Sequence, residues 1–319
     1  SSDWSSDVCS SDLSGGNITD DGGATITARG VCWSNSENPT IEDDTTLNGT
    51  GTGSFVSNLN GLDPGTMYYV RAYVSNSAGT AYGQQESFTT CDTVVDYDGN
   101  VYLTMQIGNQ IWMIENLRSS HYADGTPILN VEYNWDTLTY TERAYCWYDN
   151  DSASNAETYG ALYTWAAIMN GAASSSTNPS GVQGICPNGW HMPSDNEWTE
   201  LINYLTNNGY GYEGSGSDIA KSMASVSGWT NSPNAGNVGN NQATNNSSGF
   251  NAVPGGGRVD VMIDEFYFED KGTKFFIWSS TEYNSSDAKR IMLDSYSSDV
   301  VQGTTIKKNG FSARCIKNE

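Results

Sequence analysis

The clearest hydrophobic pattern in the chain follows the turn at 186–193. Ser194 and Glu197 have the S-x-x-E spacing of a capping box, in which each side chain satisfies a free backbone N–H at a helix start. Apolar residues then recur at i, i+3, i+4 and i+7, which is one face of a helix: Trp198, Leu201, Ile202 and Leu205. The pattern therefore predicts a helix that begins after Ser194 and stops near Gly209.

Two other stretches have a helical pattern. Residues 159–170 carry an apolar stripe and are followed by Gly171, a residue that often ends helices. The stripe consists of Leu162, Trp165, Ala166 and Met169. A shorter helical piece is expected near 219–223. The chain is therefore expected to contain a few helices among many strands.

Alternation of apolar and polar residues predicts the strands. Residues 101–107 alternate and are followed by the two-residue turn Gly108-Asn109 and a return strand at 111–114, which predicts a hairpin. Strands are expected near the C-terminus at 259–268, 274–282, 289–296, 300–308 and 310–317. Residues 233–258 have no period and are rich in Asn and Gly. They are predicted to form a long loop, and such loops are usually functional or disordered.

Residues 14–90 have the pattern of a small β-sandwich, with short β-rich runs between turn residues. The runs are 24–34, 53–59, 67–77 and 80–88. The spacing from Leu62 to Val70, with Pro64 and Tyr68 between them, resembles the corner of fibronectin type III domains where a tyrosine hydroxyl bonds to the upstream backbone. Tyr68, Val70, Ala72 and Val74 are expected to face inward, and Tyr69, Arg71 and Tyr73 outward. About two strands expected before Gly15 are absent, so this domain is interpreted as truncated, with a spacer role.

Residues 1–13 repeat Ser-Ser-Asp three times and have no period of a helix or strand. They resemble translated sequencing-adapter read-through and are interpreted as non-native or disordered, a natural Ser/Asp tail being the alternative. The true N-terminus is then expected to be missing, so a signal peptide would not be visible.

Charge excludes several classes of partner. The 319 residues include 14 basic and 37 acidic side chains, giving a formal net charge of −23. Nucleic acid and anionic membranes are poor partners, because both are bound through Lys and Arg. No apolar run approaches the roughly 18 residues of a membrane helix. Aromatic residues make up 12% of the chain, which is typical of a folded protein rather than a disordered one.

Few residues suggest a metal or catalytic site. Two oxygen-rich clusters are weak candidates for calcium: Asp96, Asp98 and Asn100 in one, and Asp149 and Asp151 in the other. The alternative is that these residues form turns by bonding their own backbone. His191 is interpreted as a packed structural residue and His121 as a surface loop residue. No P-loop, nucleophile elbow or dinucleotide fingerprint is present. No catalytic residue is assigned, and calcium is the one cofactor considered.

Several segments between 92 and 319 resemble the Fibrobacter succinogenes major paralogous domain family. They occur in the family's order: DGNVYLTMQIGNQIWMIENLR, AYCWYDND, YGALYTWAA, CPNGWHMPSDNEWTELINYL, GFNAVPGGGR, FIWSSTE and GFSARCIK. MPSDNEW and GFSARC are also similar to the formylglycine-generating-enzyme and C-type-lectin-like fold. The resemblance implies an α+β, C-type-lectin-like domain at 91–319 in a secreted or surface-attached bacterial protein. Nothing matches the active-site thiol pair of the formylglycine-generating enzymes, so oxidase activity is not transferred.

The resemblance also implies a disulfide. Cys186 and Cys315 lie in family-like segments that meet in the implied fold, because its last strand returns beside the helical layer. Cys91 and Cys146 form a second, weaker candidate pair. Cys32 is expected to be a buried free thiol. No cysteine pair has the spacing of a zinc site.

Three functions remain open at this stage. The preferred one is a non-catalytic binding or adhesion module, outside the cell, whose ligand is a polysaccharide or cell-surface glycan. Its ligand surface is expected on the long loop and nearby aromatic residues: Trp147, Trp229, Asn240, Asn241 and Asn245. The alternatives are an enzyme acting on polysaccharide and a structural cell-surface protein. The sequence does not indicate the oligomeric state or the mode of attachment.

Overall fold

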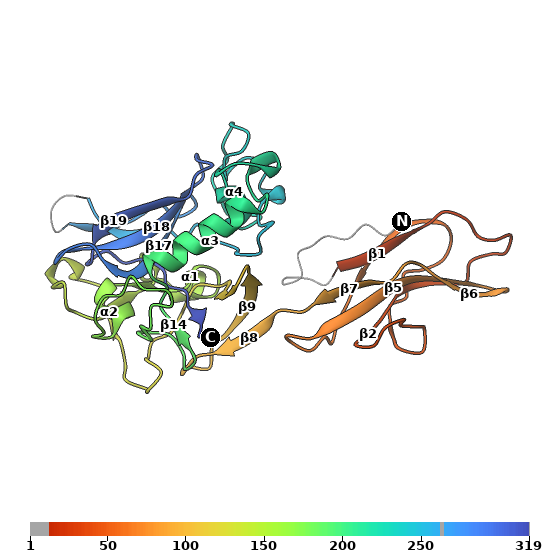
Figure 1. Cartoon of the computed structure of the whole chain (residues 1–319), viewed down its shortest axis with the longest axis horizontal. Coiled ribbons are helices and arrows are strands. Elements are labelled where there is room, and N and C mark those ends of the chain that lie inside the picture. Colours follow the sequence, from red (N-terminus) through yellow and green to blue (C-terminus); the bar gives the residue numbers. More distant parts are fainter. Residues whose placement is uncertain (1–12, 262–264, 319) are drawn as a thin grey trace. The chain divides into compact units, whose positions relative to one another are not determined.

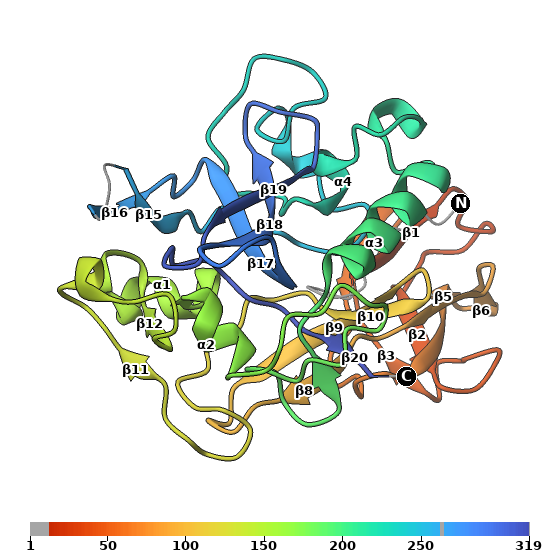
Figure 2. The same ribbon diagram turned by 60° about the vertical axis from the view of Figure 1, so that its left-hand side comes forward.

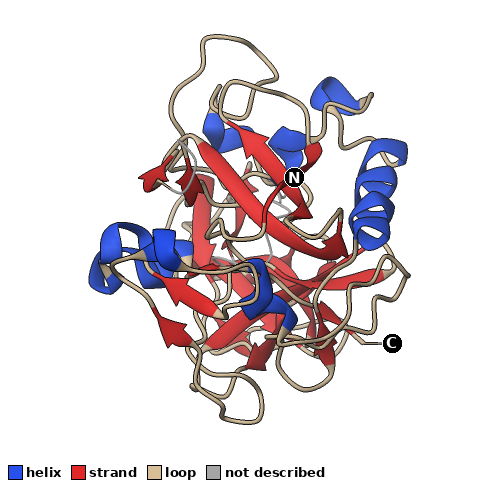
Figure 3. Ribbon diagram, turned by 90° about the vertical axis from the view of Figure 1, so that its left-hand side faces the viewer, coloured by secondary structure: helices blue, strands red, loops and turns tan. Residues whose placement is uncertain are grey.

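The computed structural model describes residues 13–261 and 265–318. The chain forms two compact units, and the boundary between them lies between Thr93 and Val94. The expectations for residues 1–12 lie outside the described residues, but Leu13 already belongs to a strand. Among the described residues the fold is rich in strands and has four α-helices, all short and all in the second unit (Figures 1 and 3). No helix in this part of the chain is long and apolar enough to cross a membrane.

The first unit contains two antiparallel sheets. Strand β1 (Leu13–Ile18) pairs with β4 (Gly53–Asn58). The other sheet has the order β3-β2-β5-β6, and β7 also pairs with β5. Its strands are β2 (Ala28–Ser34), β3 (Asp44–Thr45), β5 (Met67–Asn76), β6 (Gly79–Tyr82) and β7 (Glu86–Thr89). The run expected at 80–88 is thus two strands, both paired with β5.

The buried face of β5 is close to the expected one. Tyr68 and Val70 are buried in the core of this unit, and the Tyr68 hydroxyl accepts a hydrogen bond from the upstream Asp63 N–H at 3.1 Å. The outward assignment of Tyr73 is wrong. Tyr73 is buried, and its hydroxyl donates to the carbonyl oxygen of Thr46, the residue directly after β3, at 2.7 Å.

A five-stranded sheet with the order β14-β20-β10-β9-β8 joins the two ends of the second unit, and its edge strand β8 spans the boundary between Thr93 and Val94. The strands are β8 (Asp92–Val95), β9 (Val101–Ile107), β10 (Gln110–Met113), β14 (Trp190–His191) and β20 (Ile316–Lys317). The hairpin of β9 and β10 is as expected. Trp112 of β10 pairs with Ile316 of β20, so the last strand closes against the first hairpin.

The centre of the second unit is the antiparallel sheet β17-β18-β19, formed by β17 (Lys274–Glu282), β18 (Asp287–Asp294) and β19 (Val301–Ile306). Strand β17 is buried on both faces, and its first half carries the apolar run from Phe275 to Trp278. Phe276 and Trp278 belong to the hydrophobic core that includes residues of α2, whereas Phe275 and Ile277 belong to the core that includes residues of α3 and α4. The ribbon of β17 lies between α2 on one side and α3 and α4 on the other (Figure 2). The sheet therefore separates two hydrophobic cores.

Helix α3 (Asp195–Asn207) has the expected capping box, in which the Ser194 and Glu197 side chains each bond the other residue's backbone N–H. Helix α4 (Ala220–Met223) also lies where expected. The single helix predicted at 159–170 is wrong. It is replaced by α1 (Ser152–Tyr159), the two-residue strand β13 (Leu162–Tyr163) and α2 (Trp165–Met169).

Gly160 explains this break. Its φ is +73°, and a Cβ there would lie 2.6 Å from the Leu117 carbonyl oxygen. The chain therefore leaves the helix at Gly160 in a conformation that only glycine adopts easily. Strand β13 then pairs with β12 (Ala144–Cys146), which also pairs with β11 (Leu129–Asn130).

The remaining C-terminal elements are shorter than expected. The strand predicted at 259–268 is a hairpin of β15 (Gly257–Asp260) and β16 (Phe266–Glu269). Only the last two residues of the strand predicted at 310–317 belong to β20. Four 3-10 turns occur among the described residues: η1 (Trp135–Thr137), η2 (Tyr148–Asn150), η3 (Tyr212–Gly214) and η4 (Gln242–Thr244).

Candidate functional site

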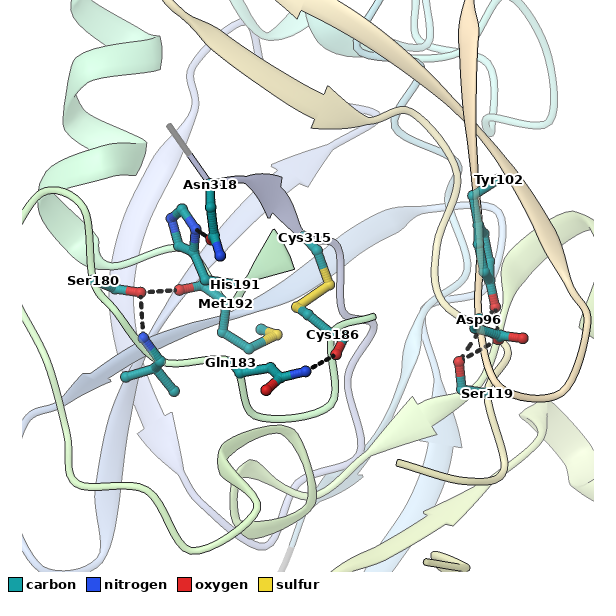
Figure 4. Close-up of a disulfide and its surroundings, with 11 residues drawn as sticks. Asp96, Tyr102, Ser119, Ser180, Gln183, Cys186, His191, Met192, Cys315 and Asn318 are labelled. Atoms are coloured by element: carbon teal, nitrogen blue, oxygen red, sulfur yellow. Dashed lines mark hydrogen bonds between the residues drawn. A yellow bond between two sulfur atoms is a disulfide. The ribbon is translucent and has the colours of Figure 1, made fainter. Parts of the chain in front are cut away.

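The turn before α3 is joined to the last strand by a disulfide. Cys186 and Cys315 are 129 residues apart in sequence, their Cα atoms lie 5.9 Å apart, and their sulfur atoms are bonded (Figure 4). The predicted pairing is therefore present. Beside it, β14 pairs with β20, so the covalent link and the backbone pairing hold the same two segments together.

The weaker candidate pair, Cys91–Cys146, is wrong. Cys146 is a free thiol, fully buried in β12, and burial raises its pKa to about 12 although the nearby Arg258 guanidinium acts in the opposite direction. Cys91 is disulfide-bonded, but not to Cys146. Cys32 is buried and free, as expected, and burial raises its pKa to about 11.

His191 and Glu197 form a buried pair at the start of α3. His191 Nε2 lies 2.6 Å from Glu197 Oε1, and His191 Nδ1 lies 2.7 Å from Asn318 Oδ1. The second carboxylate oxygen of Glu197 accepts from the backbone N–H groups of Ser194 and Ser180 at 2.8 and 3.2 Å. Glu197 therefore caps the helix and holds the histidine, which is the structural role expected for His191.

The environment favours the protonated form of His191. Burial lowers its pKa, but the hydrogen bond and the charge of Glu197 together with the hydrogen bond to Asn318 raise it above the ordinary value. A pocket of about 250 Å³ lies beside the ring. Both ring nitrogens of His191 already have protein partners. His191 therefore has a structural role and is not a free acid or base.

The first calcium candidate is a hydrogen-bonded clasp. The Asp96 carboxylate accepts from Asn100 N and Nδ2 at 2.9 and 2.8 Å. It also accepts from the Tyr102 hydroxyl at 2.7 Å and from Ser119 Oγ (Figure 4). The Asn100 side chain thus points its NH₂ group, not its oxygen, at Asp96. With four donors on one carboxylate, Asp96 holds the 96–102 turn against Ser119.

Asp98 binds the adjacent segment in the same manner. It accepts from Ser120 N and Oγ at 2.6 and 3.1 Å, and from His121 N and Nδ1 at 3.2 and 2.6 Å. Burial raises the pKa of Asp98. The hydrogen bonds from Ser120 and His121 together lower that pKa by more than burial raises it, so the net shift is downward. His121, expected in a surface loop, is partly exposed and packs against the Tyr97 ring.

The second calcium candidate forms a turn and a helix cap. Asp151 Oδ1 accepts from Ser154 N at 3.1 Å at the start of α1. Asp149 and Asn150 have positive φ, and Asn150 Nδ2 donates to the Glu132 carbonyl oxygen. Over residues 13–261 and 265–318, no group of three or more His, Cys, Asp or Glu side chains could hold a metal ion. Both acidic clusters therefore have the turn-forming role that the sequence left as the alternative.

The long loop is packed, which corrects its assignment as the ligand surface. Asn245 is buried, and its Nδ2 donates to the carbonyl oxygens of Ser225 and Val238 at 2.9 and 3.1 Å. Trp229 is also buried, with its Nε1 donating to Ser225 Oγ. Neither side chain can contact a ligand, because both have their polar atoms satisfied inside the protein.

A buried lysine organises this loop. The Lys221 ammonium group donates to the backbone oxygens of Asn240 and Asn241 and to Asn245 Oδ1 at 2.6 Å. Burial lowers the pKa of Lys221. Asn240 also donates to the Ser232 carbonyl oxygen, so among the three asparagines only Asn241 is exposed. Sequence composition could not reveal this arrangement, because Lys221 lies outside the loop.

Trp147, the last candidate for the ligand surface, is partly buried. Its ring packs edge-on against Tyr145 at 5.7 Å between centroids. The structure therefore does not gather the five predicted ligand residues onto one surface.

The outer face of α3 carries a shallow, open groove that the sequence reasoning missed. Its volume is about 530 Å³, and it is lined by polar side chains around one aromatic ring: Asn109, Asn196, Thr199, Glu200, Asn203, Tyr204, Asn207 and Asn208. Asn109 enters from the turn between β9 and β10. The helical spacing of Asn196, Asn203 and Asn207 on the side opposite the apolar stripe was the signal in the sequence.

The asparagine amides of this groove are available to a ligand. Within the described residues, the side chains of Asn109, Asn196, Asn203 and Asn207 make no hydrogen bond to protein, and all four residues are exposed. Each amide both donates and accepts hydrogen bonds. The groove therefore offers a row of neutral donors and acceptors beside the Tyr204 ring.

Residues 105–317 match the Fibrobacter succinogenes major domain in a comparison with known protein families. Neither curated proteins nor solved structures gave a match to the chain. The matched stretch includes the Cys186–Cys315 disulfide, the His191–Glu197 pair and the whole α3 groove, and it covers more than half of the chain. The chain therefore belongs to the Fibrobacter succinogenes major domain family.

Proposed function

We propose that this protein is a non-catalytic binding module that acts outside the cell and binds a neutral polysaccharide through the groove on α3. The observation that carries the proposal is the lining of that groove. Exposed asparagine amides without protein partners lie beside a tyrosine ring. A polyhydroxylated ligand matches this lining, since hydroxyl groups pair with amides and the apolar face of a sugar ring packs on an aromatic side chain.

Charge supports a neutral ligand. The chain has a formal net charge of −23, and most of its Lys and Arg side chains lie over aromatic rings within the protein. Lys307, for example, is buried over the Trp165 ring and bonded to Glu282. Basic groups used in this way cannot displace the counterions of a polyanion, so nucleic acid is not part of the proposal.

We propose a C-type-lectin-like arrangement for the second unit and an immunoglobulin-like, fibronectin-related spacer for the first. The pairing of β10 with β20 and the ordered loop between α4 and β15 support the former. The hydrogen bond from Asp63 N–H to the Tyr68 hydroxyl supports the latter, because it has the form of a tyrosine corner. The Cys186–Cys315 disulfide supports an oxidising, extracytoplasmic location.

The test compares two variants for binding to soluble neutral polysaccharides by affinity electrophoresis. Asn203→Ala/Asn207→Ala removes two groove amides and places a good helix former at each position. Asn241→Gly removes the exposed amide of the long loop and suits its positive φ of 43°. We expect the helix variant to bind roughly tenfold more weakly or worse, from the loss of two hydrogen bonds. We expect Asn241→Gly to bind as the unmodified protein does.

Three other outcomes would each contradict the proposal and favour a different explanation. Loss of binding in Asn241→Gly alone would move the ligand surface to the loop. Release of shortened products from a polysaccharide would establish an enzyme. No binding to any polysaccharide by the intact protein would favour a structural cell-surface role.

A further inference from the structure

Arg290 stands apart from the other arginines of this chain. Each of the other six donates at least one hydrogen bond to protein: Arg29, Arg71, Arg118, Arg143, Arg258 and Arg314. Within the described residues Arg290 donates none and forms no salt bridge. Its Nη1 atom is buried and has no hydrogen-bond partner. A guanidinium withdrawn from water in this way is costly unless something pairs with it.

The position of Arg290 keeps its guanidinium close to the sheet surface. Arg290 lies in β18, opposite Trp278 of β17 and Gly303 of β19. Its Cζ atom lies 5.6 Å from the centre of the Phe276 ring. A Cβ atom on Gly303 would lie 3.5 Å from Cζ and Nη2 of Arg290. The Arg290 side chain therefore crosses β19 above Gly303. The residue as a whole is only partly buried, although its Nη1 atom is buried.

Two lysines near Arg290 each have an acidic partner, whereas Arg290 has none among the described residues. Lys274 lies over the same Phe276 ring, but its Nζ atom is paired with Asp270 at 3.1 Å. The adjacent Lys289 is paired with Asp195 at 3.8 Å. Burial lowers the pKa of Arg290. Among the acidic residues that the structure describes, none forms a salt bridge with Arg290, whereas Lys274 and Lys289 each have one.

Two deeply buried cations show how the fold satisfies such groups when they are structural. Arg314 is fully buried without a carboxylate, but it donates to Asn116 Oδ1 at 2.8 Å and to the carbonyl oxygens of Phe250 and Asn251. Lys221 is satisfied by three oxygens of the long loop. These two structural cations receive neutral oxygen acceptors, and Arg290 receives none from the part of the chain that the structure describes.

We propose that Arg290 is a binding subsite for a single carboxylate of an external ligand, on the face of the β17-β18-β19 sheet that carries Phe276. A planar carboxylate matches two N–H groups of a guanidinium at once. The nearby Lys274 and Lys289 are already paired with protein acids, so one positive charge is available and a monoanion fits better than a phosphate dianion. The α3 groove borders the other core, so this subsite is independent of the proposed polysaccharide groove.

The carboxylate could be supplied by an acidic sugar or by an acidic peptide side chain, and the experiment separates them. The intact protein is labelled with ¹⁵N, and the Nε–Hε signal of Arg290 is assigned with the Arg290→Met variant. Sodium glucuronate and a blocked glutamate, acetyl-Glu-amide, are the two probes, with glucose and sodium chloride as controls. We expect a saturable shift of the Arg290 signal with at least one carboxylate probe, and the stronger probe identifies the source.

A stability comparison provides the second readout. Arg290→Met should leave the melting temperature unchanged or raise it, because it removes a charge without a partner. Arg314→Met, the matched control, should lower it by several degrees, because it removes donors from three buried oxygens. The effective carboxylate probe should raise the melting temperature of the unmodified protein and not that of Arg290→Met.

Two results would overturn the proposal. One is an Arg290 shift that is equal for the carboxylates, glucose and chloride. The other is a loss of stability in Arg290→Met as large as that in Arg314→Met, which would make Arg290 a structural residue. Failure of polysaccharide binding at α3 would leave both readouts unaffected.

Discussion

Glu197 holds His191 at 2.6 Å while the same carboxylate closes the capping box of α3. One side chain thus fixes the helix start and the strand that precedes it. His191 pairs with Ile316 in the strand that follows Cys315, so the pair also adjoins the segment closed by the disulfide. This geometry leads to a prediction about pH.

The His191–Glu197 pair should make stability depend on pH. The pKa of His191 is raised in the folded protein, so its contribution is fully present below the ordinary histidine pKa of about 6.5. The contribution is lost as pH rises through the folded-state pKa. Denaturant unfolding from pH 5 to 9 should show this decline in the unmodified protein. Glu197→Gln, which removes the charge, should flatten it, and equal slopes in the two proteins would contradict the assignment.

Removal of the disulfide should destabilise the second unit. Cys186→Ala/Cys315→Ala opens a loop of 129 residues, and loss of a native disulfide typically costs about 2–5 kcal/mol. The measurement is denaturant unfolding of both proteins under non-reducing conditions. Cys146→Ala is the control, because its buried thiol is unbridged. A peptide map with Cys186 and Cys315 both free, in protein from an oxidising compartment, would refute the bridge.

Lys221 should be essential to the order of the long loop. Lys221→Met removes the donor shared by three loop oxygens, and unsatisfied buried acceptors cost about 1–3 kcal/mol each. The expected result is lower stability and faster proteolysis between residues 233 and 258. Asn241→Gly should change stability by no more than about 0.5 kcal/mol, as an exposed substitution does. Similar proteolysis of both variants would show that Lys221 does not order the loop.

Replacement of residues 233–258 by a short Gly-Ser linker should impair folding. An unstructured loop would tolerate this change, but here Val238, Phe250 and Ala252 are buried core residues. Loss of those side chains leaves cavities, and Phe→Ala changes alone cost about 3–5 kcal/mol. Circular dichroism and thermal melting of the replacement variant would test this. A cooperative melt near that of the unmodified protein would disprove it.

The two units should fold separately. Their boundary lies between Thr93 and Val94, and each has its own hydrophobic cluster. A fragment of residues 92–319, which keeps β8 whole, should unfold in one cooperative transition in denaturant. A fragment without near-ultraviolet circular dichroism would show that its packing depends on the preceding residues.

Local sequence determined the elements whose stabilising contacts lie close along the chain. The capping box of Ser194 and Glu197 and the apolar stripe of α3 were readable because a helix places residues three and four apart on one face. The hairpin of β9 and β10 was readable from its turn. The sequence also indicated the family and the Cys186–Cys315 pair, through segments characteristic of that family.

Tertiary structure decided the features that join distant residues. Lys221 and Asn245 are 24 residues apart, so an Asn-rich loop that appeared to be free surface is packed around a buried ammonium group. Gly160 ends α1 because the Leu117 carbonyl oxygen lies where a side chain would be, and helical periodicity cannot show that contact. Arg314 is fully buried and donates to three oxygens, whereas Arg290 is partly buried and has no acceptor among the described residues. Burial and hydrogen-bond satisfaction depend on the whole fold, so composition and spacing could not determine them.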